Sequence, residues 1–271
     1  MDNLIDKLIK GTQKKVSKIE GLLYSVLLDY FIDNLSIGDD KIKYTSSNIN
    51  IVNRIDKALD RRLSGSLAKV AKFIFSGIKS VLVGTEKMTE RYDTRETQVS
   101  PSVTNKVLKH ASTTIAQKVD LEAVFSELKQ LTLNEMANYD GISLRQLRGK
   151  LKEKIEEKKI VNKYFSRWTH DIYNQYQRIG GDEIRKDIGL RFAIYQGGLI
   201  ATSRGFCESR NGKVFHESEI ESWQGLNWEG KPETGYNPFY DLGGYNCRHR
   251  LDWISDGLAF RLRPELKQIY G

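Results

Sequence analysis

The chain has 271 residues, of which 39% are hydrophobic, and its 43 basic and 35 acidic side chains leave a net charge of +8. This length allows one large domain or two ordinary ones, and the composition excludes wholesale disorder. Two cysteines are too few for a disulfide-built scaffold, so we expect a protein made in a reducing cytosol. We expect no membrane span, because lysines interrupt the most apolar window, Leu67 to Val83.

The positive charge is distributed unevenly along the chain. From Arg191 onward ten basic side chains balance ten acidic ones, so the whole excess lies in the first 190 residues. A basic helical half can attract nucleic acid or an acidic protein surface. A lysine-rich solvated surface is the alternative interpretation.

Two long helices are predicted at the start of the chain. Apolar residues recur every three to four positions over residues 3–35, with Gly11 and Gly21 as weak points. The same spacing continues over residues 49–83, and Gly84 is a plausible helix stop.

The middle of the chain alternates between polar connections and further helices. The polar segment 85–102 is expected to be an exposed connection, and helical spacing resumes over residues 103–131. Ser143 is predicted to cap a charged, solvated helix over residues 144–160.

Aromatic and basic side chains mix over residues 161–195. They could form a stacking platform for single-stranded nucleic acid. Because Tyr164, Trp168 and Ile172 step by four, we prefer a core-facing helical stripe.

The pattern changes after Gly198 to a sequence rich in glycine, aromatic and turn residues. Asn211-Gly212 is a tight-turn dipeptide that predicts a hairpin from Phe206-Cys207 to Lys213–Phe215, and Ser218 is predicted to cap a short helix. We therefore predict an α+β protein. A long, mainly α-helical assembly region (1–160) would be followed by a small α+β C-terminal module with a β-hairpin (161–271).

The C-terminal motifs resemble a known family. Ser203-Arg204-x-x-Cys207, then Gly212 to Phe215, then Gly243 to His249 are similar to the terminal domain of phage Mu F-like head morphogenesis proteins. The resemblance covers residues 160–255, but the family's His-Pro dipeptide and a second cysteine soon after Cys207 are absent. The motif residues are Arg204, Cys207, Gly212, Gly243, Gly244, Asn246, Cys247, Arg248 and His249.

The resemblance implies a minor head (capsid) structural protein of a tailed bacteriophage, without catalytic turnover. Such a protein acts in head assembly at the portal or the capsid interior. The implied partners are the portal and major capsid proteins, with packaged double-stranded DNA as a further candidate. Several copies would be made in the host cytoplasm and placed in the virion.

Two other functions are alternatives. His216, Asn246 and His249 in a compact module could serve a metal-dependent nuclease, although the order and spacing of a nuclease hairpin-helix site are not met. The basic half alone favours a nucleic-acid-binding protein without chemistry.

The cysteines and histidines of the module leave three interpretations open. Cys207, His216, Cys247 and His249 could form a tetrahedral zinc site, since side chains two apart on a strand face the same side. A Cys207–Cys247 disulfide and two buried thiols are the alternatives. We expect no obligatory cofactor, with zinc as the alternative, and a module held by its own aromatic side chains. Arg204 and Arg248 are expected to donate to backbone carbonyls or to nearby carboxylates.

Overall fold

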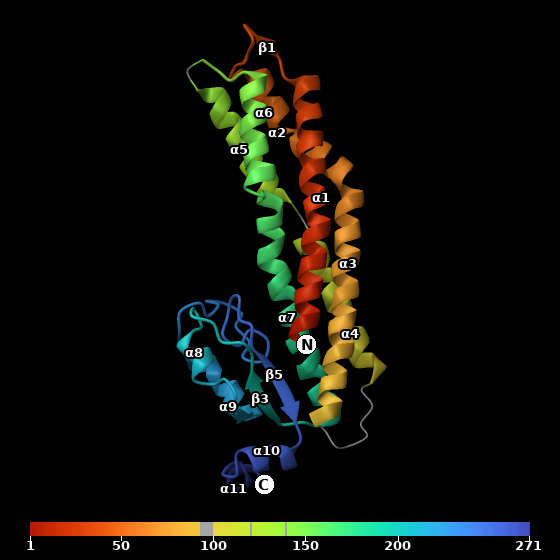
Figure 1. The fold of residues 1–271 in the computed structure, drawn as a ribbon, viewed down its shortest axis with the longest axis vertical. Coiled ribbons are helices and arrows are strands. Elements are labelled where there is room, and N and C mark those ends of the chain that lie inside the picture. The colour runs from red at the N-terminus through yellow and green to blue at the C-terminus, as the bar shows by residue number, and fades with distance from the viewer. Residues whose placement is uncertain (93–99, 120, 139) are drawn as a thin grey trace. The chain divides into compact units, whose positions relative to one another are not determined.

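The α+β class is confirmed by the computed structural model, which describes residues 1–92, 100–119, 121–138 and 140–271 (Figure 1). Long helices fill the N-terminal part, and a small antiparallel sheet lies in the C-terminal part. The described elements are α1 (Asp2–Asn34), β1 (Ile37–Gly38), β2 (Lys41–Ile42), α2 (Ser46–Asn53), α3 (Ile55–Tyr92), α4 (Pro101–Lys118), α5 (Glu122–Ala137), α6 (Leu144–Lys152), η1 (Glu153–Glu157), α7 (Ile160–Ile188), β3 (Phe192–Gln196), α8 (Gly205–Glu208), β4 (Val214–His216), α9 (Glu217–Ser222), η2 (Trp223–Gly225), β5 (Arg250–Ile254), α10 (Asp256–Leu262) and α11 (Leu266–Tyr270).

The chain divides into two compact units. The module unit contains Met1–Leu8, Phe75–Thr114 and Thr169–Gly271, and the helical unit contains Ile9–Ile74 and Ile115–Trp168. Helices α1, α3, α4 and α7 contribute residues to both units. The predicted boundary at residues 160 and 161 stays a prediction. Among the described helices we find none whose length and apolar character would let it cross a membrane.

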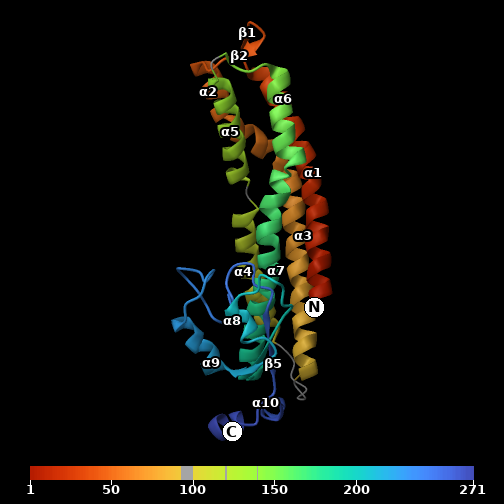
Figure 2. The same ribbon diagram turned by 60° about the vertical axis from the view of Figure 1, so that its left-hand side comes forward.

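Close packing of α1 against α3 explains a glycine inside the helical unit. The two helices run side by side in both views (Figures 1 and 2). A Cβ atom at Gly11 would lie 2.6 Å from the Phe73 ring, so glycine allows the close approach. Neither Gly11 nor Gly21 interrupts α1, because packing of an apolar face outweighs the low helix propensity of glycine.

The predicted cap of the charged helix is confirmed. Ser143 accepts a hydrogen bond from the backbone of Gln146, whose side chain in turn accepts one from the Ser143 backbone. This capping box starts α6, which continues into the π-helical turn η1. Lys159 then adopts a left-handed φ of 50° that separates η1 from α7.

The predictions of a helix stop at Gly84 and of an exposed connection from residue 85 were wrong over residues 84–92. Helix α3 continues to Tyr92, and a Cβ at Gly84 would lie 2.7 Å from the Met1 side chain. Thr85 and Thr89 are buried and donate their hydroxyls to carbonyls one turn earlier, which removes the cost of burying them. Residues 93–99 of the expected connection lie outside the described residues.

The module contains a three-stranded sheet in the order β4-β3-β5, with antiparallel pairing throughout. Asn211-Gly212 does not join two hairpin strands as predicted, because Phe206 and Cys207 lie in α8 and β4 pairs with β3. The cap prediction at Ser218 was also wrong: His216 precedes α9, and its ring accepts from the Ser218 backbone.

Candidate functional site

The sheet has two buried faces because successive side chains of a strand point in opposite directions. Along β3, Ala193 and Tyr195 belong to one cluster, whereas Phe192 and Ile194 belong to the other. We call the first the cysteine face and the second the C-terminal face. The cysteine face is covered by α8, α9 and η2, and the C-terminal face by α10 and α11.

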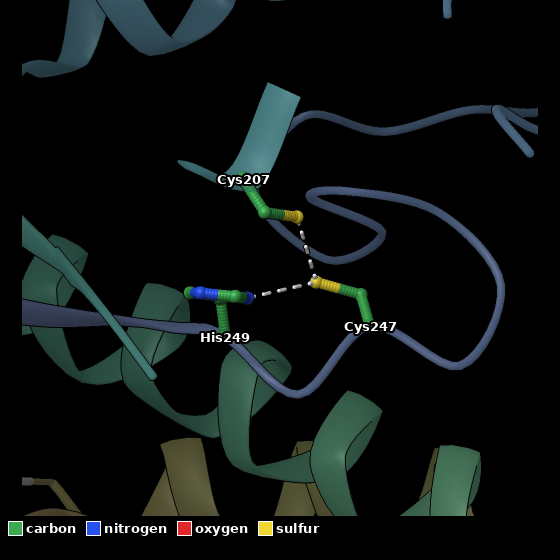
Figure 3. A group of neighbouring side chains, drawn as sticks. All are labelled: Cys207, Cys247 and His249. Atoms are coloured by element: carbon green, nitrogen blue, oxygen red, sulfur yellow. Dashed lines mark hydrogen bonds between the residues drawn. The ribbon is translucent and has the colours of Figure 1, made fainter. Parts of the chain in front are cut away.

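Both cysteines lie at the centre of the cysteine face. Cys207 comes from α8 and Cys247 from the loop before β5, and both are buried as free thiols (Figure 3). Their sulfur atoms are 3.9 Å apart, whereas a disulfide requires about 2.05 Å. The hydroxyl of Tyr195 lies 3.2 Å from the Cys207 sulfur and 3.8 Å from the Cys247 sulfur.

His249 completes this group. Its Nδ1 atom lies 3.8 Å from the Cys247 sulfur, and its ring stacks on Tyr195 with centroids 4.9 Å apart. Figure 3 shows the three side chains of Cys207, Cys247 and His249 directed toward one another. One ligand atom from each lies within 4.8 Å of the other two. The opposite ring nitrogen, Nε2, is buried without a hydrogen-bond partner among the described residues.

Glycines leave the room that these side chains occupy. A Cβ at Gly243 would lie 2.3 Å from the Cys207 sulfur and 3.1 Å from the Cys247 sulfur. Gly244 has a φ of +88°, and its Cβ would collide with the Gly230 carbonyl oxygen at 2.0 Å. The two motif glycines are thus required by the sulfur pair and by the path of the loop.

Arg178 of α7 fixes the loop that carries Cys247 and His249. Its guanidinium donates to the backbone carbonyls of His249 at 2.9 Å, Tyr240 at 2.8 Å and Cys247 at 2.5 Å. Arginine suits this role because its planar group presents several donors in a fixed geometry. The backbone of both Cys247 and His249 is therefore positioned by the same side chain.

Aromatic rings enclose the group. Phe206 stacks on Trp228 with centroids 4.0 Å apart, and Trp223 makes edge contacts with Tyr195, Phe206 and Phe215. The Trp228 indole donates to the Gly243 carbonyl, which satisfies its polar edge. The polar cluster is thus surrounded by apolar side chains.

The hydrogen bond between the two thiols gives them different proton affinities. The hydrogen bond from Cys207, together with Arg178 and His249, lowers the pKa of Cys247 against the effect of burial. The same hydrogen bond to Cys247, and then burial, raise the pKa of Cys207. Burial raises the pKa of Tyr195.

The four candidate zinc ligands are not brought together. His216 lies on the C-terminal face, where its ring stacks on Tyr270 at 3.8 Å and contacts Phe192. It caps α9 through Nδ1, which is a structural role. The three residues of the nuclease alternative are also not brought together. The His216 ring contacts Phe192 and Tyr270, the His249 ring stacks on Tyr195, and Asn246 is exposed.

Three of the four remaining motif residues, Arg204, Gly212 and Asn246, shape the loops of the module. Arg204 donates to the Glu229 carbonyl, as expected for a loop-tying arginine. Gly212 has a left-handed φ of +77° and donates to the Tyr195 carbonyl. Asn246 takes a left-handed φ of 57°. Arg248 was expected to donate hydrogen bonds within the loops, but it is exposed. Arg178 instead donates to the Cys247 carbonyl.

Sequence reasoning missed Tyr195 and Arg178 as parts of this site. Both belong to the aromatic and basic stretch that was interpreted as a helical stripe. A signal was present in the run Phe192 to Gln196, where β-branched and aromatic residues end at two glycines, as is typical of a strand. A strand predicted over this run would have placed Tyr195 on one face of a sheet.

Comparison of the chain with protein-family models, with curated proteins and with solved structures found no match. The resemblance to Mu F-like head morphogenesis proteins therefore depends on the motif residues themselves.

Proposed function

We propose that the protein is a minor structural component of a tailed-phage head, incorporated during assembly at the portal or the capsid interior. One observation carries this proposal beyond the resemblance. The two halves of the motif, 40 residues apart, meet in one buried cluster, where Cys207, Cys247 and His249 are 3–4% exposed. Motif residues that are buried inside a module are more typical of a structural protein than of an enzyme with an open catalytic cleft.

The composition of purified particles tests the assembly role. Mass spectrometry of mature heads and of assembly intermediates should find the chain in a fixed ratio to the portal protein. A chain missing from both, while portal and major capsid proteins are present, would refute the proposal. Deletion of the gene should reduce the yield of filled heads, with rescue by the wild type and by Arg248→Met, whose side chain is exposed.

The proposed role needs no catalysis, and this can be tested directly. The purified protein should leave single- and double-stranded DNA intact in the presence of Mg²⁺ or Mn²⁺. Cleavage that disappears in a folded His249→Ala variant would overturn the assignment in favour of a nuclease.

Binding to packaged DNA is the second candidate function. It is favoured by a hollow on the helical unit that is lined by lysines. Lys14, Lys159 and Lys163 line this hollow, together with Lys158 and Glu157. Lys158 is 2.7 Å from Glu153, so the other three lysines are the better phosphate partners. Lysines that contact phosphates release counterions, which makes binding salt-dependent.

Binding to duplex DNA at several salt concentrations tests this contact. Replacing Lys14, Lys159 and Lys163 by glutamine should lower the affinity and reduce the slope of log K against log salt by about 2–3, at roughly 0.9 per phosphate contact. The matched control replaces three other exposed lysines of the same unit, Lys57, Lys69 and Lys72. Equal losses in both variants would indicate general charge attraction rather than this hollow.

A further inference from the structure

Two distances between the buried sulfur and nitrogen atoms on the cysteine face are close to those between ligands of one zinc ion, and the three ligand atoms lie within 4.8 Å of one another. A tetrahedral zinc ion with Zn–S bonds of about 2.3 Å holds two sulfurs roughly 3.8 Å apart. The Cys207 and Cys247 sulfurs are 3.9 Å apart, and the His249 Nδ1 atom is 3.8 Å from the Cys247 sulfur. We propose that Cys207, Cys247 and His249 bind one Zn²⁺ ion, with the hydroxyl of Tyr195 on the fourth side.

Tyr195 is placed to close the coordination shell. Its hydroxyl oxygen lies 3.2 Å from the Cys207 sulfur and 3.8 Å from the Cys247 sulfur, which are distances expected between two ligands of one ion. Tyr195 extends from β3, a central strand, and the His249 ring stacks against it. The site is thus closed by protein groups, as in structural zinc sites, and keeps no position for a substrate.

The charges of these groups suit a divalent ion in an apolar interior. Two thiolates balance Zn²⁺, and a neutral imidazole and phenol add no charge, so the complex is neutral. Burial of a neutral complex avoids the large penalty for an isolated ion. Without the ion, the same four groups contact one another mainly through sulfur at 3.2–3.9 Å, which are weak hydrogen bonds.

The ligands are held in place by contacts that do not involve a metal. Arg178 fixes the carbonyls of Cys247 and His249, and glycine at position 243 leaves space beside both sulfurs. Supporting contacts of this kind orient metal ligands before the ion arrives. The set differs from the one expected from sequence, since Tyr195 takes the place of His216.

Metal analysis and cobalt substitution of the full-length protein test the site. The protein purified without chelators should contain one zinc per chain by elemental analysis. After exchange with Co²⁺, it should show the near-ultraviolet thiolate-to-cobalt absorption and the intense visible bands of four-coordinate cobalt. Because Cys207 and Cys247 are the two cysteines of the chain, the thiolate absorption can come from these residues only.

Variants then assign the ligands. His249→Ala should weaken Co²⁺ binding at least tenfold, whereas His216→Ala, the control on the other face of the sheet, should bind Co²⁺ like the wild type. Cys207→Ser and Cys247→Ser should each lose much of the thiolate absorption. Tyr195→Phe should shift the visible bands, and an unchanged spectrum would remove Tyr195 from the ligand set.

The wild-type measurements alone can refute the proposal, so they remain decisive if a variant does not fold. A protein with native circular dichroism, no zinc and no thiolate-to-cobalt absorption would overturn it. Equal effects of His249→Ala and His216→Ala would also overturn it. The zinc site and the head-assembly role can fail separately, because a zinc-free chain found in phage heads would refute the site only.

Discussion

Replacement of Arg178 by methionine should destabilise the module more than any change at an exposed arginine. The side chain is 7% exposed and donates to the carbonyls of Tyr240, Cys247 and His249. Methionine preserves much of the volume but has no donor. Each buried carbonyl left without its donor costs about 1–3 kcal/mol. Relief from burying a charge offsets part of this, so we expect a loss of about 3–5 kcal/mol in the free energy of unfolding.

Urea unfolding followed by tryptophan fluorescence measures this loss where it occurs. Three of the four tryptophans, Trp223, Trp228 and Trp253, pack on the cysteine face. The control is Arg248→Met, the same chemical change at an exposed position next to Cys247, with an expected effect within about 0.5 kcal/mol. If the two variants unfold at the same urea concentration, the carbonyl contacts contribute nothing measurable and the reasoning fails.

Three further predictions concern positions whose environment is equally specific. Gly243→Ala should lower the free energy of unfolding by about 1–3 kcal/mol, because the added methyl group would collide with the Cys207 sulfur. Gly198→Ala, in open space, should be neutral or slightly stabilising, and equal effects of the two changes in denaturant melts would contradict this. Burial lowers the pKa of His216, so the unfolded chain binds the proton more readily and the free energy of unfolding should fall as pH drops below about 6.5. In His216→Asn, the free energy of unfolding should depend less on pH in this range. Ser143→Ala removes the α6 cap and should cost about 1 kcal/mol in thermal or urea unfolding, while an unchanged midpoint would show the cap to be dispensable.

The helices were predictable because their apolar spacing is a local property of the sequence. Several errors fall at glycines, where the sequence does not say what approaches the missing side chain. Gly84 is the plainest case: it was predicted to stop a helix, but it makes room for Met1 while α3 continues. Such contacts join residues far apart in the chain, and a helical pattern does not encode them.

The candidate site was predictable only in part for a related reason. Cys247 and His249 were expected on the same side because they are two residues apart. Their ligand atoms do lie close together, although both residues precede β5 and are not part of it. His216 was considered as a fourth zinc ligand because a turn at Asn211-Gly212 was expected to bring it beside Cys207. In the structure α8 replaces the first hairpin strand, and strand alternation directs His216 to the opposite face.

Removal of the proposed zinc ion should lower the melting temperature of the module without unfolding it at room temperature. The aromatic shell supports the fold independently, since each large buried aromatic side chain contributes about 2–3 kcal/mol. Zinc at a thousand times its dissociation constant adds about 4 kcal/mol. At roughly 2–4 °C per kcal/mol, chelation should lower the transition by about 10 °C and leave the far-ultraviolet circular dichroism unchanged at 25 °C.

The same chelator should not shift the melting temperature of Cys247→Ser, which lacks a ligand, and added zinc should restore the wild type. A module that unfolds at 25 °C when zinc is removed would show that the shell formed by Phe206, Trp223 and Trp228 is insufficient without the ion. An unchanged melt in a protein shown to carry zinc would mean that the ion contributes no folding energy. Either result would contradict the division of stability between aromatic packing and metal binding that the enclosure of Cys207, Cys247 and His249 implies.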